Sequence, residues 1–148
     1  SPAESIVAVG LNHKTAPIQL REQLAFRNTS LTEVVQELRS RCGLNECAII
    51  STCNRAEFYA VSTHDGAASL FDALARIRHV DRRELQSHSY EHHDTEAVWH
   101  LCRVASGLDS MVVGENQVLK QVKDASEAAV AAGTSGPILA ALFRQAVT

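Results

Sequence analysis

Three short segments of the chain are almost continuously apolar, which is the pattern of strands buried in a sheet. They cover residues 6–11 (IVAVGL), 47–52 (CAIIST) and 57–62 (EFYAVS). Only a few residues separate the second segment from the third, so the pattern predicts a tight antiparallel hairpin. A fourth strand is expected over residues 85–91 (LQSHSYE), where apolar residues are sparse.

Apolar residues that recur three and four positions apart indicate helices between and after these strands. After Ser30 this spacing continues to Leu38, and Ser30 with Glu33 forms the sequence pattern of a capping box. Gly43 is expected to end this helix, because glycine adopts the left-handed conformation found there. The predicted helices begin near residues 17, 30, 66, 94, 114 and 137.

The order of elements is β-α-β-β-α-β followed by helices, which predicts an α+β fold of the ferredoxin-like, split β-α-β type. In this fold an antiparallel sheet carries helices on one face, and the additional helices follow at the C-terminus. The first and second strands run parallel, so their carboxyl ends lie at one edge. We therefore expect Asn12, His13 and Lys14 to meet the stretch STCNR (51–55) at a shared rim.

The composition is typical of one globular domain. The chain has 148 residues, of which 45% are apolar and 21% are charged. No apolar run is long enough to span a membrane, and no signal peptide is visible. Because the chain begins at Ser1 and its last predicted helix runs to the end, we expect a domain cut from a longer protein.

The net charge of −3 argues against a general nucleic-acid-binding protein. We expect the one basic cluster of the chain to be a solvated helix face and turn, with a local contact to RNA as the alternative. This cluster consists of Arg76, Arg78, His79, Arg82 and Arg83.

The chain has four cysteines without CxxC spacing, so zinc-ribbon and thioredoxin-type motifs are absent. We expect reduced thiols in a cytoplasmic protein. Cys42, Cys47 and Cys102 occur at a helix end or in apolar patterns, and we expect them to be structural. Cys53 differs, because the polar residues of 51–55 surround it.

Cys53 is therefore a candidate reactive thiol, and packing in the core is the alternative. The thiolate is the attacking species, yet only about 3% of an unperturbed cysteine is ionised at pH 7. A neighbouring cation raises that fraction, and Arg55 or His100 could supply it. His100 lies off the apolar stripe of its predicted helix, so it faces either a cleft or solvent.

Two other kinds of site are less well supported. Zinc binding would use His88, His92 and His93 with Cys102 or His100. However, His88 and His92 would lie on the same side of the chain only if this segment were a helix. We expect strand and loop there. Neither GxGxxG nor GxxxxGK[ST] occurs, so the sequence gives no support for nucleotide binding by this chain.

Three stretches of the chain resemble the N-terminal catalytic domain of glutamyl-tRNA reductase. They are GLNHKTAP (10–17) with LRE (20–22), STCNRAE (51–57), and HLCRVASGLDSMVVGENQVLKQVK (100–123). Together they span nearly the whole chain. One departure is Asn116, where the family usually has proline; the change alters the backbone restriction at a turn and removes no expected catalytic group.

The resemblance implies that Cys53 is a nucleophile, which takes the glutamyl group from the 3′ end of glutamyl-tRNA as a thioester, and that His100 lies near the ester. It also implies a set of residues that bind the glutamate moiety, with Arg55 pairing with its carboxylate. This set is Thr52, Arg55, Ser110 and Gln117. The other candidate substrate-binding residues in the resembling stretches are Asn12, His13, Lys14 and Glu115.

The implied reaction of the full enzyme is NADPH-dependent reduction of the glutamyl ester to glutamate-1-semialdehyde, the first committed step of tetrapyrrole, and hence porphyrin and haem, synthesis. We expect residues 1–135 to form the catalytic domain. Residues 136–148 would begin a connector helix toward NADPH-binding and dimerisation domains outside this chain.

The resemblance also implies partners and a location. The full-length enzyme would be a homodimer, glutamate-1-semialdehyde aminomutase would receive its product, and no membrane would be involved. The location would be cytoplasmic, or the plastid stroma if the source is a plant.

Two other functions stay open at this point. One is a stand-alone thiol-dependent acyl transferase or esterase that uses Cys53 and His100. It predicts turnover of simple glutamyl esters without RNA. The other is a non-enzymatic amino-acid-binding regulatory module on the same sheet, which predicts that Cys53 can be replaced without loss of function.

Overall fold

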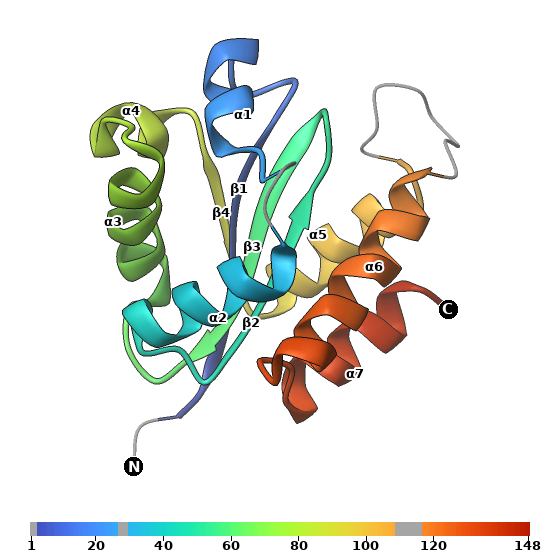
Figure 1. Cartoon of the computed structure of the whole chain (residues 1–148). Helices are drawn as coiled ribbons and strands as arrows, with labels where there is room; N and C mark the ends of the chain where they lie inside the picture. The colour runs from blue at the N-terminus through green and yellow to red at the C-terminus, as the bar shows by residue number, and fades with distance from the viewer. Residues whose placement is uncertain (1–2, 27–29, 109–116) are drawn as a thin grey trace.

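The computed structural model describes residues 3–26, 30–108 and 117–148, and it contains a four-stranded sheet between two layers of helices (Figure 1). The strands are β1 (Ser5–Asn12), β2 (Glu46–Ser51), β3 (Arg55–Ser62) and β4 (Tyr90–His93), in the order β2-β3-β1-β4. Every described pairing is antiparallel. Because β1 and β2 both run against β3, they are parallel to each other. This confirms the predicted ferredoxin-like fold.

Helices cover both faces of this sheet. The first face packs against α1 (Ile18–Leu24), α2 (Leu31–Cys42), α3 (Gly66–Arg78) and α4 (Arg82–Ser87). The second face packs against α5 (Thr95–Ala105), α6 (Gln117–Ala132) and α7 (Pro137–Ala146), which are the additional C-terminal helices. None of the helices in the described ranges is long and apolar enough to cross a membrane.

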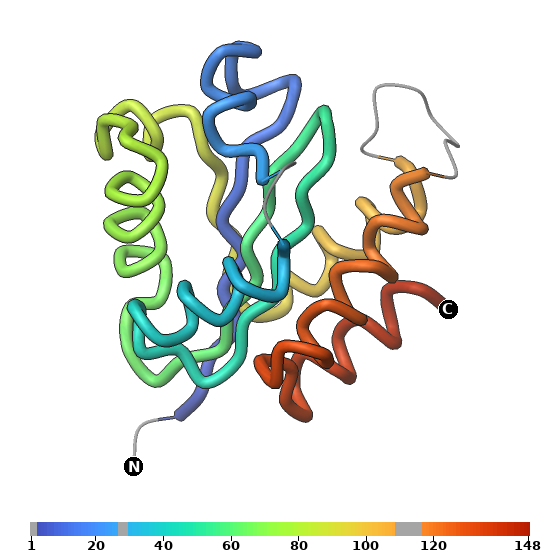
Figure 2. Tube along the Cα trace, viewed as in Figure 1, coloured from blue at the N-terminus to red at the C-terminus, as the bar shows by residue number. Residues whose placement is uncertain are grey.

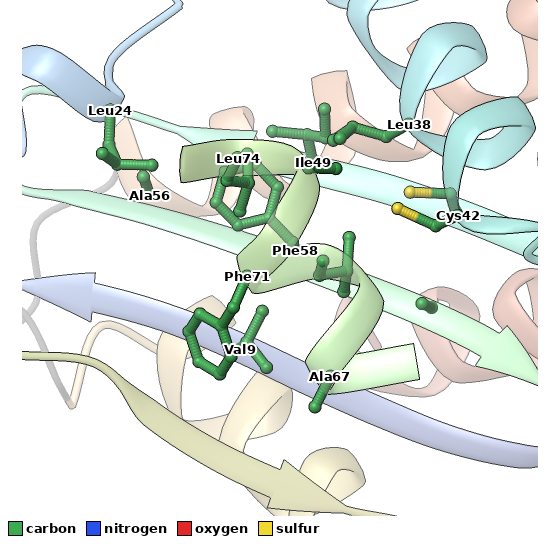
Figure 3. Packing of buried hydrophobic residues seen from close by; sticks show 14 of the residues in the cluster. Val9, Leu24, Leu38, Cys42, Ile49, Ala56, Phe58, Ala67, Phe71 and Leu74 are labelled. Atoms are coloured by element: carbon green, nitrogen blue, oxygen red, sulfur yellow. The ribbon is translucent and has the colours of Figure 1, made fainter. Parts of the chain in front are cut away.

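The two layers explain why the strands read as continuous apolar runs. Successive side chains of a strand point to opposite faces. Val7 and Val9 of β1 therefore enter the first core, while Ala8 enters the second. Figure 3 shows Phe71 and other members of the first core between α3 and the strands. In the second core Tyr59 meets the ring of Phe143 edge-on, with centroids 5.9 Å apart.

The fourth strand differs from the prediction over residues 85–91. Residues 82–87 form α4 instead, and the strand follows as Tyr90–His93. The side chain of Asp81 accepts hydrogen bonds from the backbone amides of Arg83 and Glu84, which starts the helix. Leu85, the buried residue of this helix, packs into the first core. Because α4 has only 6 residues, its apolar residues do not recur often enough to show a helical period in the sequence.

The predicted start and end of α2 are partly confirmed. Ser30 takes the N-cap position, but its side chain makes no capping hydrogen bond, so the predicted capping box is wrong in that detail. Gly43 ends the helix with a positive φ of 62°, as expected from the sequence.

A buried carboxylate fixes the beginning of α7. Glu46 on β2 is 4% exposed and accepts hydrogen bonds from the backbone amides of Gly136 and Leu139, both at 2.8 Å. A Cβ atom on Gly136 would lie 2.6 Å from the Glu46 carboxyl carbon, so a larger residue there would displace this carboxylate. The C-terminal helix is thereby attached to the edge strand of the sheet. Its residues Leu139 and Phe143 are part of the second core.

Candidate active site

Cys53 lies at the tip of the tight hairpin turn between β2 and β3. The hydroxyl of Thr52 accepts hydrogen bonds from the backbone amides of Asn54 and Arg55, both at 3.1 Å. The Thr52 amide in turn donates to the Arg55 carbonyl at 2.8 Å. These bonds curl the chain immediately after the strand, and the Cys53 side chain is exposed to solvent. The predicted hairpin is confirmed.

The loop after β1 lies at the same end of the sheet as this turn (Figure 2). Asn12, the last residue of β1, is directly opposite Arg55 in the strand register. Its side-chain oxygen accepts hydrogen bonds from the amides of Lys14 and Thr15, which folds the loop back. His13 is half-buried and Lys14 is exposed. The two polar loops therefore share one rim, as the sequence predicts.

A buried carboxylate that the sequence analysis missed lies below the turn. Glu57 on β3 is 0% exposed. Its Oε2 accepts hydrogen bonds from Arg55 Nη1 at 2.9 Å and from the hydroxyl of Tyr90, and it lies 2.6 Å from His100 Nε2. Its Oε1 accepts from the Tyr59 hydroxyl at 2.7 Å. Glu57 thus joins side chains of β3, β4 and α5 in one network.

The carboxyl of Glu57 is ionised despite its position. Burial by itself would raise its pKa, but the hydrogen bond and charge of His100, together with Arg55 and Tyr90, outweigh burial and lower the pKa to about 2. Burial and the neighbouring Glu57 carboxylate raise the pKa of Tyr59 well above its usual value. Tyr59 is therefore a neutral hydrogen-bond donor to the carboxylate.

His100 is oriented by this carboxylate and by its neighbours. An ionised carboxylate can only accept a hydrogen bond, so His100 Nε2 is the donor, and Nδ1 is the acceptor in the neutral ring. The ring of His92 stacks on it with centroids 4.5 Å apart, and the ring of Tyr90 lies at 4.9 Å. A histidine held by a carboxylate is the usual arrangement of a catalytic acid or base.

Arg55 is almost completely buried in the folded domain. The residue is 3% exposed, and Nη1 of its guanidinium is ion-paired with Glu57. The resemblance implies that Arg55 also pairs with a substrate carboxylate. Such a role stays a prediction.

The cysteines differ in their exposure. Cys42 and Cys47 are buried, as expected for structural residues. Burial raises the pKa of the Cys42 thiol to about 11 and that of the Cys47 thiol further still. Cys102 is half-buried on α5, and Cys53 is the exposed thiol. Of the four thiols, Cys53 is the one placed to meet a large substrate.

Of the remaining candidate residues, the structure describes Gln117. Gln117 is exposed at the first turn of α6. Ser110 and Glu115 lie outside the described residues, as does Asn116. Within the described ranges, no three His, Cys, Asp or Glu side chains come together as a metal site would require. His88 instead contacts the carbonyl of Glu84 through its Nδ1.

The basic cluster is only partly a solvated face. Arg76, His79 and Arg83 are exposed. Arg78 is half-buried: its Nη2 donates to the Ala25 carbonyl at 2.9 Å, and its guanidinium lies over the ring of Phe26. The prediction of a solvated side chain is therefore wrong for Arg78, which attaches the end of α1 to α3.

A signal for Glu57 was present in the sequence. Alternate residues of a strand share one face, so Arg55, Glu57 and Tyr59 had to point the same way. Polar groups of opposite charge on one face of a buried strand imply a paired network, because an unpaired buried charge is costly. Its partners Tyr90 and His100 come from distant elements and could not be read from this pattern.

Comparison with known proteins agrees with this geometry. The family model for "Glutamyl-tRNAGlu reductase, N-terminal domain" matches residues 9–148. Glutamyl-tRNA reductase of Pseudomonas syringae pv. syringae is 46% identical over 140 residues, which are 95% of this chain and 33% of that protein. The enzyme of Frankia alni is 45% identical over 145 residues, which are 97% of this chain and 31% of that protein.

Similarity to a solved structure indicates the same family. Glutamyl-tRNA reductase from Methanopyrus kandleri superposes with a TM-score of 0.80 at 34% identity, covering 96% of this chain and 32% of that one. The chain thus spans about a third of the length of the relatives that it matches. It belongs to the glutamyl-tRNA reductase family, of which it represents the N-terminal domain.

Proposed function

We propose that this domain takes the glutamyl group from glutamyl-tRNA onto Cys53. The Cys53 thiolate attacks the ester carbonyl carbon, the bond from that carbon to the ribose oxygen breaks, and the tRNA leaves with its hydroxyl restored by a proton. A thioester on Cys53 remains. A thioester accepts hydride more readily than an oxygen ester, so the covalent step divides a difficult reduction into two easier ones.

The observation that carries this proposal is the exposure of Cys53 at the tip of the hairpin turn, beside the loop after β1. A thiol in this position can reach an ester at the end of a large RNA, which buried thiols cannot. The Thr52 bonds hold the turn in a fixed shape.

His100 is the group that we propose for proton transfer to the leaving ribose oxygen. Glu57 holds its ring through Nε2, which leaves Nδ1 for exchange of the proton. We also propose that Arg55, with Thr52, Ser110 and Gln117, binds the glutamyl side chain and its carboxylate. A guanidinium fork recognises a carboxylate through two parallel hydrogen bonds.

The second half of the reaction is proposed to need a part of the enzyme beyond this chain. NADPH would supply the hydride that converts the thioester to glutamate-1-semialdehyde and restores the Cys53 thiolate. The sequence contains no glycine-rich dinucleotide motif, so we propose that another domain binds NADPH. The product would enter tetrapyrrole synthesis through glutamate-1-semialdehyde aminomutase, and the full-length enzyme would be a homodimer.

The acyl transfer can be tested by mass spectrometry of the intact chain after brief exposure to glutamyl-tRNA. We expect the mass to increase by one glutamyl group, and peptide mapping to place this group on Cys53. The Cys53→Ala variant should lose the adduct. Cys102→Ala, a change at a half-buried cysteine on α5, should keep it. An adduct that survives in Cys53→Ala would refute the proposal.

The proposal that hydride transfer needs a domain beyond this chain can be tested by adding NADPH to the same mixture. We expect no glutamate-1-semialdehyde from the 148-residue chain, although the Cys53 adduct forms. Formation of the aldehyde would show that the hydride-transfer site lies within this chain.

A further inference from the structure

We propose that an open hollow beside His100 binds the terminal adenosine of the charged tRNA, with Trp99 as the surface on which its base stacks. The hollow has a volume of about 340 Å³, and it is lined by His92 of β4 and by Glu96, Trp99, His100 and Arg103 of α5. This volume lies in the range of about 300–1,000 Å³ found for small-molecule sites. The inference rests on the proposed function, because it names where part of the same substrate binds.

The exposure of Trp99 is the first observation behind this inference. Its side chain is 67% exposed, although the other side of α5 carries Leu101 and Val104 into the second core. Trp99 and Arg103 are one helical turn apart, so they share a face of α5. A flat, exposed aromatic ring beside a cationic side chain is typical of sites where proteins bind unpaired bases.

The position of His100 is the second observation. The same ring lines the hollow and donates to Glu57 in the candidate catalytic network. In an aminoacyl-tRNA the ester oxygen belongs to the ribose of the last nucleotide, so its base lies only a few bonds from the reacting carbonyl. If the ester lies at His100, the base on the same ribose must therefore lie next to His100. The hollow provides open space at this position.

The charges of the hollow fit this nucleotide. Arg103 is exposed and can pair with the phosphate that precedes the terminal ribose. The carboxylate of Glu96 is also exposed and can accept a hydrogen bond from the amino group of adenine. Both side chains are on the same face of α5 as Trp99 and are within its first three turns.

The intrinsic fluorescence of the protein tests the inference directly, because Trp99 is the one tryptophan of the chain. We expect adenosine 5′-monophosphate to change this fluorescence until the site is saturated. Uncharged tRNA with its complete 3′ end should do the same at a lower concentration. The same tRNA without its terminal adenosine should bind more weakly and leave the fluorescence unchanged. An unchanged signal with all three, or equal changes with both tRNAs, would overturn the inference.

Variants provide a second measurement. Loss of base stacking in Trp99→Ala should raise the tRNA concentration needed for half-maximal formation of the Cys53 adduct by about 5- to 150-fold. Trp99→Phe, which keeps an aromatic face, should restore most of this loss. Val130→Ala serves as the matched control, since Val130 is a 65% exposed apolar residue on α6 outside the hollow.

The outcomes separate the two proposals. If the glutamyl adduct forms on Cys53, and Trp99→Ala needs the same tRNA concentration for half-maximal adduct as Val130→Ala, the proposal of the adenosine site is wrong and that of the acyl transfer stands. If Cys53 is never labelled but the terminal adenosine still changes the Trp99 signal, the nucleoside site stands and the acyl transfer is wrong.

Discussion

At the scale of single residues, Glu57 organises a network of polar side chains from β3, β4 and α5. A buried charge is tolerated only when it is paired and hydrogen-bonded. The donors to Glu57 come from β3, β4 and α5, so its carboxylate fixes His100 and Arg55 relative to the sheet. We infer that Glu57 positions these two residues and does not itself touch the substrate.

The low pKa of Glu57 predicts a pH-dependent stability. In the unfolded chain this carboxyl takes up a proton near pH 4.5, but in the folded chain it does so only near pH 2. The unfolded state therefore binds more protons between these values, and stability falls as the pH is lowered through this window. We expect Glu57 to account for a loss of about 2 kcal/mol between pH 7 and pH 3, measured by urea unfolding.

The comparison for this prediction is Glu57→Gln, which cannot titrate. Its stability should fall less over the same pH range, by about the amount that Glu57 contributes. The variant removes the ion pair between residue 57 and Arg55 and should be less stable at pH 7. If it does not fold, a nuclear magnetic resonance titration of the Glu57 carboxyl in the unchanged chain replaces it. A titration midpoint near 4.5 would contradict the prediction.

At the scale of elements, the attachment of α7 to β2 depends on Glu46. The first amides of a helix have no partner within the helix, and here a carboxylate from a distant strand accepts from them. Asp65 performs a similar role for α3 within its own segment, through one hydrogen bond from the amide of Ala68 at 3.0 Å. The Glu46 cap joins the sheet to a helix of the second layer, whereas the Asp65 cap lies within its own segment of the chain.

We expect Glu46→Ala to lower the free energy of unfolding by about 2–3 kcal/mol, because three amides, one buried and two partly buried, lose their acceptor. Asp65→Ala is the matched control, with an expected loss of about 1 kcal/mol. Urea unfolding of both variants measures the difference. Equal losses would show that the Glu46 bonds add nothing beyond an ordinary helix cap.

The local periodicity of the sequence was enough to place most elements. It predicted the hairpin, the helix after Ser30 and the helix from Pro137. It failed at α4, which is too short to show a helical period, and at the Ser30 cap bond. It could not predict the Glu46 cap, because the residues that meet there are far apart in the chain.

At the scale of the whole molecule, one sheet is shared by two hydrophobic cores. Leu70 of α3 lies in the first core and Leu101 of α5 in the second, and each is 0% exposed. Neither layer of helices can bury its apolar face without the strands between them. We infer that the two layers unfold together.

Leu70→Ala and Leu101→Ala test this cooperativity. Each should lower the free energy of unfolding by about 2–5 kcal/mol, because each leaves a cavity in a packed core. Unfolding should stay a single transition when it is followed by both far-ultraviolet circular dichroism and Trp99 fluorescence. Separate transitions from the two probes would show that the C-terminal layer unfolds independently.

The sequence by itself determined the order of the elements apart from α4, the tight turn that contains Cys53 and the resemblance to a family. These follow from patterns among neighbouring residues, such as apolar periodicity, turn-forming side chains and contiguous motifs. The tertiary structure decided which distant side chains meet. It brought Tyr90 and His100 to Glu57, Glu46 to the start of α7, and His92 to the α5 side chains that line the hollow. The reason is physical: such contacts depend on how the layers pack, and no local pattern encodes that packing.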